Sequence, residues 1–498
     1  MPTDFRLYPV LRVFLFFQVF SAFAATPSTL PGLQRDGSTL LPNQWSLNPV
    51  GRQVTVGDFP SQLALHPKEN VVAVLHSGWG KHEVRVLDVA SGEIIATAPI
   101  EESFYGIAWS PDGRTLYVSG AGFEVVHVLA FEKRQLRADR QIQVRPVAEQ
   151  GVPSGIAVSR DGSALYVAES WGQRVEKIPT AKGTKALWSR SFASAEGAAT
   201  TEHEGQRLKP SSSPDAPFPY TCVPDEKRGR VYVSLWAKST VLVLDAETGA
   251  DIARWPVGQH PNEMLLAPDG RLFVAESNFN TVSVIDTATG RVTETLSTSL
   301  YPNSPPGSMP NSLALSPDGE LLFVANANNN NVAVFEVETR GKARSLGFIP
   351  VGWFPTSVRV SRDGRTLIVA NGKGLASAPN PKGPYPGTPV PRDLQEYIGG
   401  LFRGTVSLIE LPTEKRRAEQ FGQWSKTAFA CCPLAPDASV RGVDSRPAGN
   451  PIPARIGEAS PIKHVIYIVR ENRTYDQVFG DLEIGNGDPK LCLFGEKV

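Results

Sequence analysis

The residues best suited to chemistry lie near the C-terminus, where Glu471 and Asn472 follow an apolar run. The run, Val465 to Val469, has five apolar residues in succession, which is typical of a strand buried on both faces of a parallel sheet. Thr474 has the residue type of a helix N-cap, and we expect a short helix from there through Phe479. Ligands bind at the carboxyl ends of strands in open α/β sheets, and oxygen donors suit hard cations. The pair could therefore bind a divalent metal ion; the alternative is a polar strand end without a metal.

Histidine and cysteine, which also bind metals, show no ligand spacing in this chain. No cysteine pair has the C-x-x-C spacing of a zinc site. Cys222 is expected to be a small buried hydrophobe, whereas Cys431 or Cys432 could form a disulfide with Cys492. The histidines among the repeats described below are expected to be structural or surface residues: His66, His76, His82, His127 and His260.

Most of the chain consists of seven copies of a short sequence pattern. The fold that these copies form must position any functional side chains. In each copy a turn leads into an apolar strand, a polar turn and a second strand. The copies begin 42 to 66 residues apart, a period that matches a four-stranded propeller blade and is too long for a helical hairpin. Their first residues, called anchors below, are Pro60, Phe104, Pro153, Pro219, Pro261, Pro310 and Pro355.

The sequence predicts four strands within one repeat. Five copies carry Asp-Gly between the first two strands, and this dipeptide provides the positive φ that a two-residue hairpin turn needs. A third strand such as 280–286 closes on Thr289-Gly290, and a more variable fourth strand such as 349–352 leads to the next anchor. One blade cannot bury its two apolar faces alone, so seven must stack around an axis.

The last repeat shows only three strands after its anchor, at 357–360, 366–370 and 404–411. Upstream of the first anchor, residues 51–57 read like the fourth strands of the other repeats. We predict that this segment completes the seventh blade. The two ends of the ring would then pair with each other, and no edge would stay open to aggregation.

These patterns predict an all-β fold, a seven-bladed β-propeller over residues 51–411 preceded by a lead-in at 25–50. A charged, then Pro/Gly/Ala-rich linker is expected over 412–460. Residues 461–498 would form the start of an α/β domain, with its first strand and helix start.

Two inserts interrupt the blades, a polar one at 193–217 and a proline-rich one at 372–403. The polar insert explains the 66-residue spacing between the third and fourth anchors. The proline-rich insert is expected to be a long surface loop, which could hold a partner or ligand or be a tolerated insertion. Four tryptophans near blade turns could stack nucleic-acid bases, but without a basic stripe we expect them to pack: Trp79, Trp171, Trp236 and Trp353.

The N-terminus indicates export. Arg6 and Arg12 precede an apolar run at 13–20, and Ala22-Phe-Ala24 offers small residues at the cleavage positions. We expect a signal peptide over 1–24, which would make the protein periplasmic or extracellular, with no transmembrane segment after cleavage. The alternative is an uncleaved anchor, for which the run is short. Lysine plus arginine equals aspartate plus glutamate at 50 each, which argues against nucleic acid as a partner.

The repeats resemble a known propeller family. Leu-Tyr-Val-Ala, Phe-Val-Ala-Asn and Asn280-Thr-Val-Ser-Val-Ile-Asp-Thr-Ala-Thr-Gly290 are similar to the YVTN-type, surface-layer-like seven-bladed propellers. The resemblance covers about residues 51–411 and implies the fold. Because such propellers are mostly binding scaffolds, it implies no catalytic residue within the ring.

The C-terminal segment resembles a second family. Residues 464–476, His-Val-Ile-Tyr-Ile-Val-Arg-Glu-Asn-Arg-Thr-Tyr-Asp, with Phe479-Gly-Asp-Leu and Gly485-Asn-Gly-Asp-Pro489, are similar to the opening of the phosphoesterases. These belong to the alkaline-phosphatase-like superfamily and include bacterial phospholipase C and acid phosphatases. The resemblance implies that Glu471 and Asn472 bind a divalent metal ion in the full-length form.

The same resemblance implies that the chain is the exported propeller portion of a metal-dependent phosphoesterase, a hydrolase acting on ester bonds. That superfamily also requires a serine or threonine nucleophile and further Asp/His ligands from later strands, and only 27 residues follow Glu471. We therefore expect the chain as written not to hydrolyse phosphate esters. The alternative is a secreted propeller that binds an unknown protein or small-molecule ligand on one face, with a vestigial tail.

Overall fold

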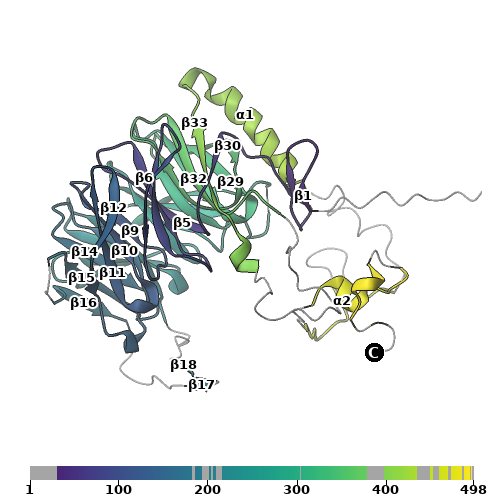
Figure 1. Cartoon of the computed structure of the whole chain (residues 1–498), viewed down its shortest axis with the longest axis horizontal. Helices are drawn as coiled ribbons and strands as arrows, with labels where there is room; N and C mark the ends of the chain where they lie inside the picture. The colour runs from purple at the N-terminus through teal and green to yellow at the C-terminus, as the bar shows by residue number, and fades with distance from the viewer. Residues whose placement is uncertain are drawn as a thin grey trace, which may run out of the picture.

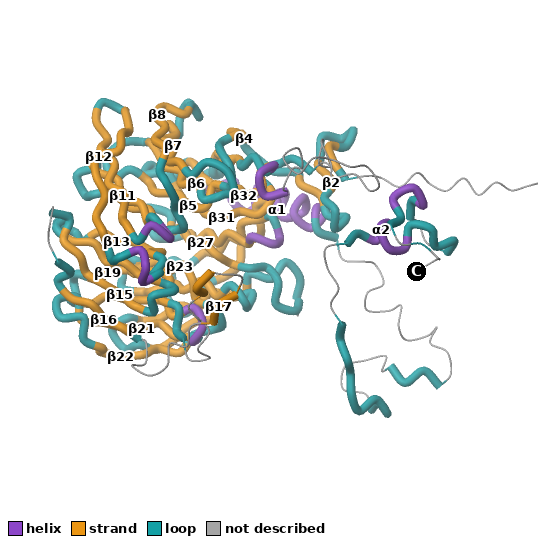
Figure 2. Tube along the Cα trace, turned by 60° about the horizontal axis from the view of Figure 1, so that its bottom comes forward, coloured by secondary structure: helices purple, strands orange, loops and turns teal. Residues whose placement is uncertain are grey.

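Seven four-stranded antiparallel sheets form a closed ring in the computed structural model of this chain (Figures 1 and 2). The structure describes residues 31–495 apart from 182–184, 193–200, 204–205, 209–215, 303, 378–397, 434–448, 453–458, 469–472, 485–486 and 494. The predicted signal peptide at 1–24 lies outside the described residues, as do Glu471 and Asn472. The prediction of an all-β, seven-bladed propeller is confirmed.

Each blade is a meander whose strands follow the chain from the axis outward. The first three blades are β5 (Pro60–Leu65), β6 (Val71–His76), β7 (Glu83–Asp88) and β8 (Ile94–Pro99); β9 (Ile107–Trp109), β10 (Thr115–Ser119), β11 (Val125–Glu132) and β12 (Gln135–Gln143); and β13 (Pro153–Val158), β14 (Ala164–Glu169), β15 (Arg174–Pro179) and β16 (Trp188–Ser191).

The next three blades have the same order. They are β19 (Pro219–Asp225), β20 (Arg230–Leu235), β21 (Thr240–Asp245) and β22 (Asp251–Pro256); β23 (Pro261–Leu266), β24 (Arg271–Glu276), β25 (Thr281–Asp286) and β26 (Arg291–Ser297); and β27 (Pro310–Leu315), β28 (Leu321–Asn326), β29 (Asn331–Glu336) and β30 (Arg344–Pro350).

The seventh blade joins the two ends of the ring. It contains β31 (Trp353–Val360), β32 (Thr366–Gly374), β33 (Thr405–Glu410) and β4 (Arg52–Thr55), and Val54 of β4 lies opposite Val406 of β33. The pairing continues beyond the strand, because the Gly404 backbone N–H donates to the Gly57 carbonyl oxygen at 3.0 Å. The predicted closing strand is therefore confirmed.

The first strands of the seven blades surround the axis, since each contacts the first strands of both neighbouring blades. They begin at or near the anchors, and the second strand of each blade ends beside the start of the first, as His76 does opposite Pro60. We call the end of the ring where these strands begin the anchor face. The connections between second and third strands lie on this same face.

The hairpin turns differ from the prediction in length. In the second blade the Ser110 N–H donates to the Thr115 carbonyl oxygen at 2.8 Å, so four residues rather than two form the loop. Asp112 accepts from the Ser110 hydroxyl at 2.6 Å, and Gly113 has a φ of 78°. The glycine thus provides the positive φ, as predicted. The turn is longer than predicted, and its aspartate accepts a hydrogen bond from the serine that begins it.

The core consists of seven apolar clusters, one between each pair of adjacent blades. The cluster between the seventh and first blades joins Ile368 and Val406 to Leu63, Val72 and Leu87, all buried. Both apolar faces of every blade are covered by this arrangement. Ring closure therefore buries apolar side chains as well as pairing backbone groups.

The predicted linker is wrong at its start, because residues 412–460 begin with an 18-residue helix, α1 (Glu414–Cys431). Phe421, Ala428 and Cys431 lie on one face of α1 and are buried. They cover β30, the outer strand of the sixth blade, and the Phe348 N–H donates to Ser425 Oγ at 2.8 Å. The charged first turn concealed an apolar stripe at helical spacing.

A small sheet formed by the lead-in lies beside α1 in both views (Figures 1 and 2). It contains β1 (Gly32–Leu33), β2 (Thr39–Leu40) and β3 (Ser46–Leu47). The polar insert carries β17 (Thr201–His203) and β18 (Gln206–Leu208), and α2 (Tyr475–Phe479) begins within the C-terminal motif at 464–476. Short 3-10 helices are η1 (Ala121–Phe123), η2 (Val147–Glu149), η3 (Trp236–Lys238), η4 (Ala327–Asn329), η6 (Ile398–Leu401) and η7 (Pro489–Leu491). None of the helices within the described residues is long and apolar enough to cross a bilayer.

Candidate functional site

The C-terminal motif does not form the predicted buried strand. Within the described part of the run, Val465 to Ile468 have no strand structure, and their exposed fractions are 77–88%. A strand buried on both faces needs neighbouring strands, and the described C-terminal residues provide none. The predicted N-cap is confirmed: Thr474 caps α2 and forms a capping box with Gln477.

Among the described residues, the clearest candidate for a ligand site is a cluster of polar side chains at the propeller axis, called the axial cluster below. Arg359 of β31 and Glu263 of β23 come from the seventh and fifth blades, and Arg359 Nη2 lies 2.9 Å from Glu263 Oε1. The two side chains are 21% and 11% exposed. Because both side chains are mostly buried, solvent and salt screen this ion pair less than they would screen a pair on the surface.

Two further blades hold the arginine in place. Arg359 Nη2 donates to Gln62 Oε1 of β5 at 3.1 Å, and Nη1 donates to Ser312 Oγ of β27 at 3.2 Å. The Ser357 hydroxyl also donates to Gln62 Oε1. Because the planar guanidinium has donors in fixed directions, these contacts fix its orientation near the propeller axis.

Two tyrosines complete the axial cluster. The Tyr105 hydroxyl donates to Glu263 Oε2 at 3.2 Å, and the rings of Tyr105 and Tyr220 have centroids 4.8 Å apart. Burial, followed by the nearby charge of Glu263, raises the pKa of Tyr105 well above its ordinary value. Burial likewise raises the pKa of Tyr220. Both phenols therefore stay protonated and can donate hydrogen bonds.

The axial cluster borders a cavity of about 110 Å³ that Gln62, Tyr105, Glu263 and Arg359 help to line. Gly106 and Gly155 also line it, and a Cβ on either would overlap a backbone atom of the adjacent first strand. The glycines thus let the inner strands approach closely. The cavity has room for several water molecules or a small polar ligand. Arg359 and Glu263 line it, although both terminal nitrogens of Arg359 also donate within the chain, Nη1 to the Val358 carbonyl oxygen at 2.7 Å.

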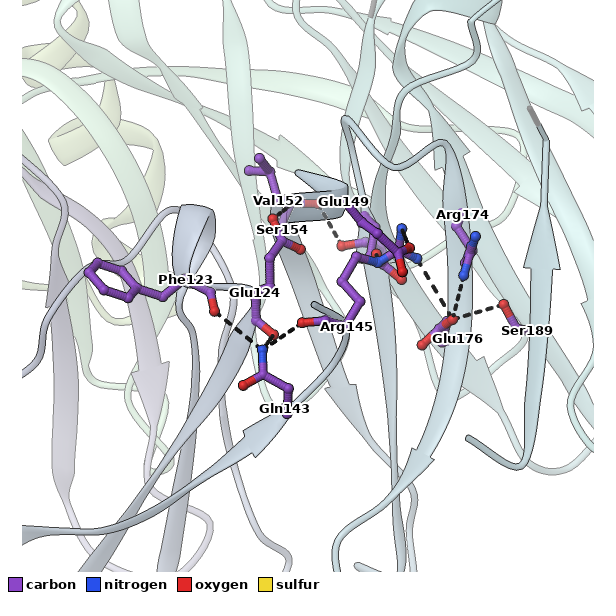
Figure 3. A network of polar contacts seen from close by, with 12 residues as sticks. Phe123, Glu124, Gln143, Arg145, Glu149, Val152, Ser154, Arg174, Glu176 and Ser189 are labelled. Carbon is purple, nitrogen blue, oxygen red and sulfur yellow. Dashed lines mark hydrogen bonds and ion pairs between the residues drawn. The ribbon is translucent and has the colours of Figure 1, made fainter. Parts of the chain in front are cut away.

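A second network of charges lies between the second and third blades (Figure 3). The buried Arg145 contacts Glu169 through Nε, and its Nη1 lies 3.2 Å from Glu149 Oε2. Burial raises the pKa of Glu169 to about 8, against the opposing charge of Arg145. Glu124 Oε1 accepts from the Val152 N–H at 2.9 Å. These contacts fix the connection before β13, so we assign the network a structural role.

The described histidines behave as predicted, and no group of three His, Cys, Asp or Glu side chains there is arranged to hold a metal ion. His76 Nε2 accepts from the Gly57 N–H at 3.0 Å, which leaves Nδ1 to donate to the Glu83 carbonyl oxygen at 3.3 Å. Burial, followed by the charge of Arg85, lowers the pKa of His76 to about 4. His260 stacks on Trp236 with ring centroids 3.8 Å apart.

The cysteines and tryptophans follow the predictions in part. Cys222 is buried as predicted, whereas all four cysteines are free, so the disulfide to Cys492 is not formed. The prediction that the tryptophans pack is wrong for Trp79 and Trp171, which are 69% and 50% exposed on the anchor face. Phe104, Phe123 and Phe279 are exposed on the same face. Trp236 and Trp353 are partly buried.

Sequence reasoning did not identify the axial cluster. Gln62 and Glu263 each stand two residues after an anchor, where the chain enters the inner strand. Polar residues at that repeated position were the available signal. Arg359 stands four residues after its anchor, and only the closed ring brings it to Glu263.

Comparisons with known proteins support the fold. The solved structure titled Kuenenia stuttgartiensis hydrazine synthase aligns with a TM-score of 0.50 and 19% identity, over 64% of this chain and 94% of that chain. The structure of U3-55K aligns with a TM-score of 0.54 and 14% identity, over 73% of this chain and 100% of that chain. No curated protein sequence matches significantly. Residues 102–375, more than half of the chain, match the family described as "Lactonase, 7-bladed beta-propeller", so this protein belongs to that family.

Proposed function

We propose that the axial cavity binds a small, neutral, polyhydroxylated cyclic ester. The observation that carries this proposal is the Arg359–Glu263 pair at the cavity, with the Tyr105 hydroxyl beside it. A ligand carbonyl oxygen would accept from Arg359, and ligand hydroxyls would donate to Glu263. The family description, lactonase, supports a ligand of this class.

The charges of the site favour the neutral ester over its ring-opened acid. Arg359 and Glu263 already neutralise each other. A carboxylate in the cavity would bring a second negative charge close to Glu263 in a poorly screened environment. The site is therefore expected to release the acid if the ester is opened there.

The test is isothermal titration calorimetry with D-glucono-1,5-lactam, a stable neutral analogue, and with D-gluconate. We expect the lactam to bind and gluconate to bind at least about tenfold more weakly. Tyr105→Phe should weaken lactam binding, because it removes one hydroxyl from the axial cluster. Tyr166→Phe, a matched change of a buried tyrosine within the blades, is the control. Equal binding of both ligands, or no effect of Tyr105→Phe, would refute the proposal.

A second proposal concerns the C-terminal motif: the propeller is the exported portion of a metal-dependent phosphoesterase in which Glu471 and Asn472 bind the metal. Its support is the motif at 464–476 and the capped helix α2, which begins at the last two residues of this motif. The protein isolated from its native source should release p-nitrophenol from bis(p-nitrophenyl) phosphate with added Mn²⁺ or Zn²⁺. The proposal fails if no release occurs, or if Glu471→Gln leaves the rate unchanged.

Export is part of this second proposal. The N-terminal pattern of arginines, apolar run and small residues supports a signal peptide over 1–24. Sequencing the N-terminus of the native protein should give Ala25 as the first residue. A protein that begins at Met1 would exclude cleavage.

A further inference from the structure

A cavity of about 360 Å³ lies on the anchor face, where the sixth and seventh blades meet the lead-in. One wall comes from the connection between β2 and β3, with Leu41 and Trp45. The sixth blade contributes Ala327, and the seventh contributes Trp353 and Phe354. The wall residues are mainly apolar, so the cavity suits the apolar body of a small molecule.

Among the described residues that line this cavity, Lys373 is the one with a charged side chain. Its ammonium nitrogen lies 4.8 Å from the ring centroid of Phe354, 5.4 Å from that of Trp353 and 5.7 Å from that of Phe402. Among the residues that the structure describes, no carboxylate forms an ion pair with this lysine. The aromatic rings thus hold a cation whose counterion is not provided by the described chain.

The backbone fixes Lys373 at this place. It stands near the end of β32 between Gly372 and Gly374. A Cβ on Gly372 would overlap the ring of Phe59, and a Cβ on Gly374 would overlap the carbonyl oxygen of Arg403. Gly374 also has a φ of 68°. The two glycines allow the strand to end in close contact with its neighbours, which keeps the lysine beside the cavity.

A partly buried cation that no described carboxylate pairs with is incompletely solvated, and burial lowers the pKa of Lys373. An anionic group placed in the cavity would restore the interactions that the ammonium has lost. The apolar walls would at the same time cover an aromatic or short acyl body. Polar groups suited to orientation are available from three asparagines that line the cavity.

We propose that this cavity binds a small amphiphilic anion, a carboxylate attached to an aromatic or short aliphatic body, with Lys373 as the charge partner. The site is separate from the axial cavity, shares no lining residue with it and takes an anionic rather than a neutral ligand. The inference is therefore independent of the proposed function of the axis.

The test compares 4-phenylbutyrate with its neutral analogue 4-phenylbutanol by isothermal titration calorimetry. We expect the acid to bind at least about tenfold more tightly than the alcohol. Lys373→Met should remove this preference, because it keeps an apolar side chain of similar length but loses the charge. Lys373→Arg should keep the preference. Lys81→Met, at an exposed lysine in a second-to-third-strand connection of the same face, is the matched control.

The outcomes separate charge recognition from general apolar binding. Equal affinity for the acid and the alcohol in the wild-type protein, or an unchanged preference in Lys373→Met, would overturn the proposal. If Lys373→Met does not fold, the wild-type protein alone can test the proposal. The acid preference of the wild-type protein should disappear as the pH rises through the lowered pKa of Lys373, and a preference that persists at high pH would equally refute the site.

Discussion

Arg359 depends on the closed ring more than any other single residue of the axial cluster. Its guanidinium contacts side chains from the first, fifth and sixth blades. Its partner Glu263 also accepts a hydrogen bond from Tyr105, which lies in the connection that leads into the second blade. If either charge is removed, the other stays largely buried without its partner. The cost of a lone buried charge exceeds the net gain from the pair.

A double-mutant cycle at this pair is the first prediction. Arg359→Met should lower the free energy of unfolding by about 2–4 kcal/mol, because Glu263 loses its counterion. Adding Glu263→Gln should recover part of that loss. The measurement is urea unfolding of the wild type, both single variants and the double variant. Strictly additive effects would mean that the two side chains do not interact.

The second prediction concerns Glu169 and pH. Because its pKa in the folded protein is raised to about 8 from an ordinary value of 4.5, the folded state keeps a proton that the unfolded chain loses above pH 4.5. This group therefore lowers stability progressively as the pH rises from 4.5 to 8. Glu169→Gln cannot ionise, so its stability relative to wild type should increase over this range.

Urea unfolding of both proteins between pH 5 and pH 9 measures the difference. Glu149→Gln, which removes a half-exposed carboxylate from the same arginine, controls for the loss of one acidic group. If the curves of wild type and Glu169→Gln stay parallel, the carboxyl group is already ionised at pH 5.

At the scale of the elements, the closing strand β4 and the histidine beside it depend on each other. His76 accepts the Gly57 N–H, and Gly57 in turn accepts the N–H of Gly404 next to β33. Protonation of His76 Nε2 would set an N–H against the N–H of Gly57. Acid should therefore act first at the seam that closes the ring.

The third prediction follows from that geometry. The pKa of His76 is lowered from 6.5 to about 4, so the unfolded chain takes up a proton that the folded protein excludes. Stability present at neutral pH is lost as the pH falls from 6.5 to 4, by up to about 3 kcal/mol. His76→Gln should lack this loss in urea unfolding at pH 4 and pH 7, whereas His464→Gln, at an exposed histidine, should retain it. An identical pH response in His76→Gln would contradict the coupling.

The fourth prediction tests whether α1 belongs to the propeller. Phe421 is 1% exposed and packs into the cluster between the sixth and seventh blades. Phe421→Ala should lower the free energy of unfolding by about 3–5 kcal/mol through the lost burial and the cavity left behind. Phe123→Ala, at a side chain 44% exposed, should cost much less. If both variants unfold at the wild-type urea concentration, α1 does not contribute to the core.

At the scale of the whole molecule, the ring could be predicted because its signals are local and repeated. The anchors and the paired strands recur seven times, and five of the copies carry the Asp-Gly turn. The segment at 51–57 matched the one strand that the seventh blade lacked. Each local choice agreed with the global fold, which is the condition under which pattern reasoning succeeds.

The axial cluster could not be predicted for the opposite reason. Gln62, Glu263 and Arg359 each read as one polar residue in an inner strand, and almost 300 residues separate the first from the last. Their contact exists only after seven blades have closed. The prediction of a buried strand at 465–468 was wrong for a related reason. An apolar run forms a buried strand only where neighbouring strands are present, and these four residues are exposed.

The most direct test of the account is a crystal structure of the protein with D-glucono-1,5-lactam. The account predicts one lactam molecule in the axial cavity, its carbonyl oxygen within hydrogen-bond distance of Arg359 and its hydroxyls on Glu263. An axial cavity that holds only water at saturating lactam, or a lactam bound elsewhere on the ring, would contradict the assignment of the axis as the ligand site.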